Sequence, residues 1–163
     1  YSIVRTKKGL AYGVGGGVGT SWDHPGLFQV GLGTKSETTV AGIDALMEEI
    51  DNLQKVPVSA DELKKAKDSI LNSFVFRFDT RGKVLREKVL YEFYGYPPDF
   101  LEKYRTAVEA VTADDVARVA RQYVHKDRLA ILVVGKQSAF DKPLSTLGAV
   151  TPIDITIPEP GAE

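Results

Sequence analysis

Two strand-like stretches followed by a long helical region constrain the fold of this 163-residue chain most. Residues 11–20 and 26–34 alternate apolar with small or polar side chains, and the segment between them has turn composition. A period of two is typical of strands, and two strands joined by a short turn form an antiparallel hairpin. In the first strand, one face would carry Tyr12, Val14, Gly16 and Val18.

Five amphipathic stretches predict helices, because their apolar residues recur at intervals of three and four. They cover residues 38–54, 60–76, 81–94, 99–107 and 112–123. Ser59 and Glu62 have the spacing of a capping box, and Thr112 is a suitable cap for the last helix. The continuous apolar run 129–134 predicts a strand that is buried on both faces.

Together these elements predict an α+β fold in which a mainly antiparallel sheet is covered on one face by several helices. A chain of 163 residues with 43% hydrophobic side chains can form one domain with a buried core. We assign residues 1–136 to this domain. Residues 137–163 contain four of the eight prolines and are expected to be a C-terminal tail or linker.

The charge and composition exclude several functional classes. With 21 basic and 22 acidic residues, the net charge of −1 gives no basis for binding nucleic acid or an anionic membrane. No apolar run is long enough to span a bilayer. The absence of cysteine excludes disulfides, thiolate metal ligands and a cysteine nucleophile.

The histidines do not predict a metal site. Only His24 and His125 are present, and neither belongs to an H-E-x-x-H motif or its inverted form, H-x-x-E-H. A catalytic zinc ion needs three protein ligands around an open position, so we expect no metal in this chain. His24 is expected to be a turn residue, and His125 should lie at a helix end, where positive charge is favourable.

Arg5 and Tyr12 are the candidate functional residues. They lie on either side of Gly9, where a turn could hold the guanidinium and the phenol near each other. Arg5 offers several donors to a carbonyl or carboxylate, and Tyr12 offers one O–H that can stabilise a developing negative charge. The spacing alone favours a solvated arginine and an ordinary strand tyrosine, because basic turns are common.

The glycine-rich run 13–19 does not fit a phosphate-binding loop. Val18 or Thr20 stands where the third glycine of G-x-G-x-x-G is required, and no Gly-Lys-Ser/Thr follows. We interpret the run as a strand that is kept free of side chains so that another backbone can approach.

Residues 4–12, Val-Arg-Thr-Lys-Lys-Gly-Leu-Ala-Tyr, resemble an element of the pitrilysin/insulinase-type (M16) zinc metallopeptidases. In the C-terminal half of these enzymes it typically reads Ile-Arg-x-Lys-x-Gly-Leu-Ala-Tyr, and here Val4 replaces the isoleucine. Further segments resemble the family in the same order: residues 59–67, 95–100, 111–116 and 132–135.

The resemblance implies that the chain is the substrate-binding, chamber-closing half of a zinc-dependent endopeptidase. Arg5 would hold a carbonyl of the peptide substrate and Tyr12 would stabilise the oxyanion, while a homologous half would bring zinc through an H-x-x-E-H motif. That half would lie on the same polypeptide or on a partner subunit. The first strand or strands of the domain would precede Tyr1, and this chain alone would hold no cofactor and be inactive. Bacterial relatives of this kind are often exported, which favours the periplasm over the cytoplasm.

A second reading of the resemblance is a non-catalytic scaffold or partner subunit, of the processing-peptidase or respiratory-complex core type. The presence of both Arg5 and Tyr12 favours the catalytic class. An H-x-x-E-H motif in the parent sequence would discriminate between the two.

Overall fold

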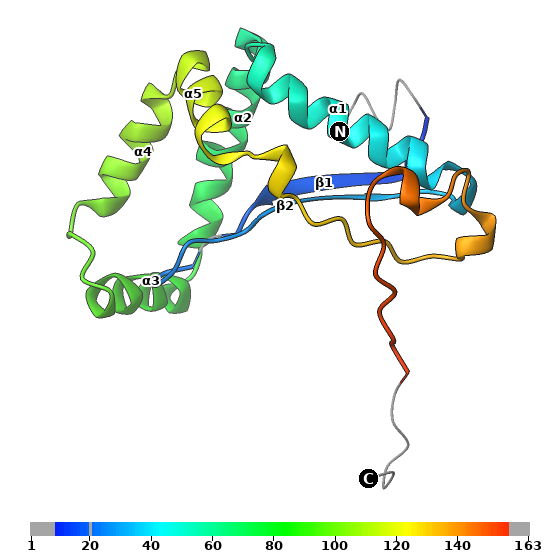
Figure 1. Cartoon of the computed structure of the whole chain (residues 1–163). Helices are drawn as coiled ribbons and strands as arrows, with labels where there is room; N and C mark the ends of the chain where they lie inside the picture. The colour runs from blue at the N-terminus through cyan, green and yellow to red at the C-terminus, as the bar shows by residue number, and fades with distance from the viewer. Residues whose placement is uncertain (1–8, 20, 157–163) are drawn as a thin grey trace, which may run out of the picture.

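A computed structural model describes residues 9–19 and 21–156 (Figure 1). Within these residues the chain forms a two-stranded antiparallel sheet and five α-helices, which confirms the predicted α+β class. The elements are β1 (Gly13–Val18), β2 (Phe28–Gly33), α1 (Thr39–Lys55), α2 (Ala60–Phe74), α3 (Arg81–Phe93), α4 (Phe100–Ala110) and α5 (Ala113–Tyr123). Each lies within about three residues of its expected bounds.

The register of the hairpin places glycines opposite glycines. Gly13 pairs with Gly33 and Gly15 with Gly31, and these four residues form one surface of the sheet, here called the glycine face. A Cβ atom added to Gly13, Gly15 or Gly31 would meet nothing within 4 Å. The glycine face is therefore open to another backbone, as the sequence predicts.

The opposite face of the hairpin is apolar and packs against α1 (Figure 1). Ala11 and Ala45 are buried there, with Leu10, Val14 and Leu32 packed around them. Along α1 itself the core side chains are Val40, Ile43 and Ile50. Burial of an aliphatic side chain of this size stabilises a fold by about 1.5–3 kcal/mol.

Helix α5 packs on α1. Its buried contact residue is Ala120, and beyond the helix the Val124 carbonyl accepts a hydrogen bond of 2.5 Å from Gln54 Nε2. Lys126 Nζ lies 2.8 Å from the Asp51 carboxylate of α1. The sheet, α1 and α5 thus form one packed unit.

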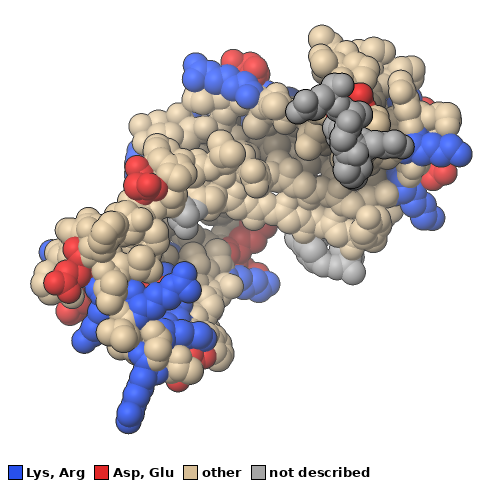
Figure 2. Space-filling view, turned by 90° about the horizontal axis from the view of Figure 1, so that it is seen from below, with Lys and Arg blue, Asp and Glu red and all other residues tan. Residues whose placement is uncertain are grey.

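Helices α2, α3 and α4 form a second group at the far end of the hairpin (Figure 1). Trp22, in the turn between β1 and β2, stacks on Tyr94 with ring centres 5.5 Å apart and planes at 9°. It also meets the edges of Tyr91 and Tyr96, at 5.6 and 5.3 Å. The tip of the hairpin is therefore fixed to the end of α3, and Lys and Arg side chains gather over this part of the molecule (Figure 2).

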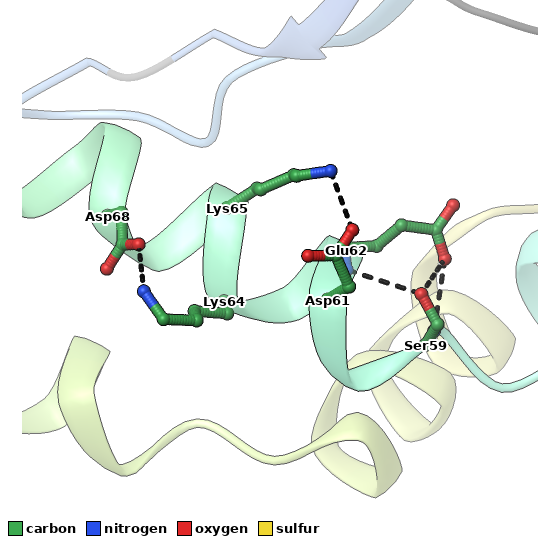
Figure 3. A network of polar contacts seen from close by, with 6 residues as sticks. All are labelled: Ser59, Asp61, Glu62, Lys64, Lys65 and Asp68. Atoms are coloured by element: carbon green, nitrogen blue, oxygen red, sulfur yellow. Dashed lines mark hydrogen bonds and ion pairs between the residues drawn. The ribbon is translucent and has the colours of Figure 1, made fainter.

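The start of α2 is fixed by the predicted capping box (Figure 3). Ser59 Oγ accepts a hydrogen bond from the Glu62 backbone N–H at 3.2 Å, and the Glu62 carboxylate accepts one from the Ser59 N–H at 3.0 Å. A second box, between Thr112 and Asp115, starts α5. These contacts satisfy backbone donors that the first turn of a helix leaves unpaired, which is why both helices begin where the sequence predicts.

The start of α1 has a different partner. Thr38 precedes the helix but makes no capping hydrogen bond with its side chain. Instead the Asp141 carboxylate accepts from the backbone N–H groups of Val40 and Ala41, at 2.8 and 3.0 Å. Desolvation raises the pKa of Asp141, but these two donors, the Asp141 backbone N–H and the charge of Lys142 together outweigh it, so the pKa lies below its ordinary value. Part of the predicted tail, around Asp141, is thus fastened to α1.

The prediction of a buried strand over residues 129–134 is wrong for the described part of the chain. The segment forms no ladder with β1 or β2, and Leu132 and Val134 are 75% and 90% exposed. An apolar run becomes a buried strand only when other strands pair with it, and neither of the described strands does. Residues 1–8, which include Arg5, lie outside the described residues, as do any strands before them.

Candidate functional site

The backbone that carries Tyr12 is held firmly to the end of β2. Gly9 has φ +62°, a left-handed conformation that glycine adopts readily. After this turn, the Leu10 carbonyl accepts a hydrogen bond from Thr34 Oγ1 at 2.5 Å, and the Tyr12 N–H donates to the Gly33 carbonyl at 2.9 Å. Ala11, between them, is 8% exposed and belongs to the core.

The Tyr12 ring lies over Gly33, at one end of the glycine face. A Cβ atom added to Gly33 would lie 2.5 Å from Cε2 and Cζ of Tyr12 and 2.7 Å from its hydroxyl oxygen. The expectation that Tyr12 shares a face with Val14 is therefore wrong, because Tyr12 precedes β1 and is not bound by the alternation of the strand. Tyr12 has 75% of its surface exposed.

A groove of about 910 Å³ opens beside Tyr12. Its walls are β1 and β2, the inner side of α1 with Leu46, Met47 and Ile50, and the unpaired segment 129–134. Among the described lining residues Tyr12 is the only ionisable one. A groove with apolar walls, bare glycine backbone and no fixed charge suits an uncharged main chain better than a phosphate or a charged side chain.

The two histidines take the places that the sequence predicts. His24 lies in the hairpin turn with Nδ1 2.7 Å from the Asp23 carboxylate, and His125 follows α5 with Nε2 3.1 Å from the Gln122 carbonyl. Hydrogen bonds from Ser21 and His24 lower the pKa of Asp23. Over residues 9–19 and 21–156, no group of three or more histidine or acidic side chains is arranged to hold a metal ion, so these residues do not fit a zinc site.

Sequence reasoning identified Tyr12 and the alternation along β2, but it did not place Gly31 and Gly33 opposite the glycines of β1. The glycines at 31 and 33 alternate with Val30 and Leu32, and that alternation was the available signal for a second bare strand opposite the first. The position of Arg5 relative to Tyr12 lies outside what the structure describes, so the pairing of these two residues stays a prediction.

None of the helices within the described ranges has the length and hydropathy that crossing a bilayer requires. A search of curated protein sequences gave no match. Residues 1–70 match the model of the family described as "Peptidase M16 inactive domain".

Among solved structures, the chain is similar to the crystal structure of a peptidase M16 inactive domain from Pseudomonas fluorescens. The TM-score is 0.68 at 23% sequence identity, over 78% of this chain and 30% of that one. The chain thus corresponds to less than a third of that protein's length. The resemblance to the M16 peptidases is confirmed by both findings: residues 1–70 match the family's inactive domain in sequence, and the chain has the fold of that domain.

Proposed function

We propose that this chain is the substrate-binding, chamber-closing half of a zinc-dependent endopeptidase, that the zinc ion is held elsewhere, and that Tyr12 takes part in the reaction. The observation that carries the proposal is the exposed phenol of Tyr12 at the end of the glycine face, in a groove without fixed charge. The match of residues 1–70 to the M16 inactive domain supports a role in a peptidase, and the lack of a metal-ligand cluster among the described residues supports a half that does not hold the zinc.

An extended peptide is the ligand that suits this groove. The glycine face lets a second backbone come close, and the edge of β2 and the segment 129–134 both offer backbone groups without a strand partner in the described structure. A peptide that adds as a strand gains main-chain hydrogen bonds that do not depend on its sequence. Affinity would come from the backbone, with little preference for particular side chains.

Tyr12 would donate its hydroxyl hydrogen to the oxygen of the scissile carbonyl as negative charge develops there. Removing one such donor typically lowers kcat by about 100-fold to 1000-fold. Arg5 would hold a neighbouring carbonyl of the substrate through its guanidinium. A homologous half, on the same polypeptide or a partner subunit, would supply the zinc ion that activates the attacking water.

The test is the Tyr12→Phe variant in an enzyme that contains the zinc-bearing half. This change deletes one O–H and keeps the ring, so kcat should fall by about 100-fold while KM changes little. Arg5→Ala should also raise KM, because a grip on the substrate backbone acts before and during the reaction. Tyr123→Phe is the matched control, since Tyr123 is an exposed tyrosine of α5 outside the groove.

The substrate for these assays should be a short peptide whose chemical step limits the rate. Wild-type kcat in the Tyr12→Phe variant on such a peptide would eliminate the oxyanion role. If the intact protein also lacked an H-x-x-E-H motif, the alternative of a scaffold or partner subunit would replace the peptidase.

A further inference from the structure

A second pocket, of about 740 Å³, lies at the end of the hairpin opposite to Tyr12. Trp22 forms one side, and the rest comes from the end of α2 and the turn after it, from α3, from the loop before α4 and from the first turns of α4. We call it the aromatic pocket; its lining includes Trp22, Phe74, Phe76, Tyr96, Phe100 and Tyr104.

The rings of the aromatic pocket form a continuous apolar surface. Phe74 stacks on Tyr104 with ring centres 5.8 Å apart, and Phe100 meets Tyr96 edge to face at 4.6 Å. Phe76, at the rim, is 65% exposed. A concave surface made of ring faces and edges is complementary to another aromatic side chain, because such pairs favour offset and edge-to-face arrangements.

The rim of the aromatic pocket carries a surplus of positive charge. Glu87, the one carboxylate among the described lining residues, already accepts hydrogen bonds from Arg77 at 3.1 and 3.3 Å and from the Tyr91 hydroxyl at 2.6 Å. Burial, together with the hydrogen bond to Glu87, raises the pKa of Tyr91 to about 12, so this donor stays protonated at neutral pH. The charges of Glu87 and Arg77 therefore neutralise each other.

The two remaining cations differ in their availability. Lys83 Nζ donates to the Asp79 carboxylate and to the Phe76 carbonyl, both at 3.0 Å. Arg86 lines the pocket and makes no hydrogen bond or ion pair with any residue of 9–19 or 21–156. Arg86 is thus the cation that can pair with a carboxylate of a ligand.

We propose that the aromatic pocket binds an aromatic side chain of a peptide in which a neighbouring residue is acidic, with Arg86 pairing with the acid. A peptide is favoured over a nucleic acid because the pocket presents one available cation, whereas single-stranded nucleic acids bind along rows of cations that neutralise successive phosphates. The site goes beyond the proposed function, and its test needs neither zinc nor cleavage.

The fluorescence of Trp22 provides the assay, because Trp22 is the single tryptophan of the chain and lines the pocket. The probe is the peptide acetyl-Gly-Asp-Phe-Gly-amide, with two matched peptides in which Ala replaces Phe or Asn replaces Asp. The Asp-Phe peptide should change the emission of Trp22 in a saturable way. The Ala peptide should leave it unchanged, and the Asn peptide should bind about fivefold more weakly, the usual scale for one exposed ion pair.

Two variants on α3 test whether the acidic residue of the peptide pairs with Arg86. Arg86→Gln should weaken binding of the Asp-Phe peptide about fivefold and leave binding of the Asn peptide unchanged. Lys88→Gln removes the same charge from an exposed position of α3 outside the pocket and should change neither. No saturable change up to about 5 mM Asp-Phe peptide would overturn the proposal. Equal losses of affinity for the Asp-Phe peptide in Arg86→Gln and Lys88→Gln would also overturn it. Tighter binding of an oligothymidine than of the Asp-Phe peptide would have the same consequence.

Discussion

Gly33→Ala should impair the enzyme by displacing the Tyr12 ring without removing its hydroxyl. The added Cβ atom would lie 2.5 Å from two ring carbons of Tyr12, whereas carbon atoms in contact lie about 3.5–4.0 Å apart. The ring must therefore shift by about 1 Å. A displacement of that size at a reacting group can lower the rate by about 100-fold, which equals about 2.7 kcal/mol of transition-state stabilisation.

The backbone should tolerate this change. Gly33 is not among the glycines with positive φ in the described residues, and it lies in β2, where alanine is accepted at least as well as glycine. The thermal unfolding temperature should therefore stay the same or rise slightly. We therefore expect Gly33→Ala to lower kcat without lowering the thermal unfolding temperature.

The assay is kcat on a short peptide, measured with the zinc-bearing half present, together with a crystal structure that locates the ring. Gly82→Ala is the control, because it adds the same methyl group in α3, outside the groove, where nothing lies within 4 Å. A Gly33→Ala variant with a displaced ring and wild-type kcat would refute the reasoning, because the position of the phenol would then be irrelevant.

Two further predictions concern stability. Ser59→Ala removes one half of the capping box of α2 and should destabilise the fold by about 1 kcal/mol, lowering the unfolding temperature by about 2–4 °C; Ser69→Ala, on the exposed side of the same helix, should not lower it. Hydrogen bonds from the Thr112 hydroxyl and backbone, and then from Arg118, lower the pKa of Asp115 to about 2. Because this pKa is below the ordinary value of 3.8, the stabilisation is present above about pH 4 and is lost as the pH falls towards 2. Urea unfolding curves at several pH values should show that Thr112→Val loses less free energy of unfolding between about pH 4 and pH 2 than the original chain does. An equal loss in the two proteins would contradict this role of Asp115.

Helix positions could be predicted from the sequence because their determinants are local. Ser59 and Glu62 lie three residues apart, and their side chains reach each other across one helical turn, so the start of α2 needs no information from the rest of the chain. The same holds for Thr112 and Asp115. The glycines of β1 likewise predict a strand that leaves room for another backbone.

Features that depend on distant partners could not be predicted. The run 129–134 has the composition of a buried strand, but burial requires neighbouring strands, and its own sequence does not reveal them. The Tyr12 ring is placed by Gly33, which lies across the hairpin, so strand alternation assigned it to the wrong face. The aromatic pocket joins a turn to three helices, and no spacing along the chain connects Trp22 with Tyr94.

The contact of Asp141 with the first turn of α1 has a consequence for synthesis on the ribosome. Asp141 lies 101 residues after Val40, so the donors of that turn are exposed to water until the later residue has been made. At about 5–20 residues per second the interval is roughly 5–20 s. During that time the hairpin and α1 would be assembling with one end of the helix still frayed, and a nascent chain halted before Asp141 would present α1 without its cap to chaperones and proteases.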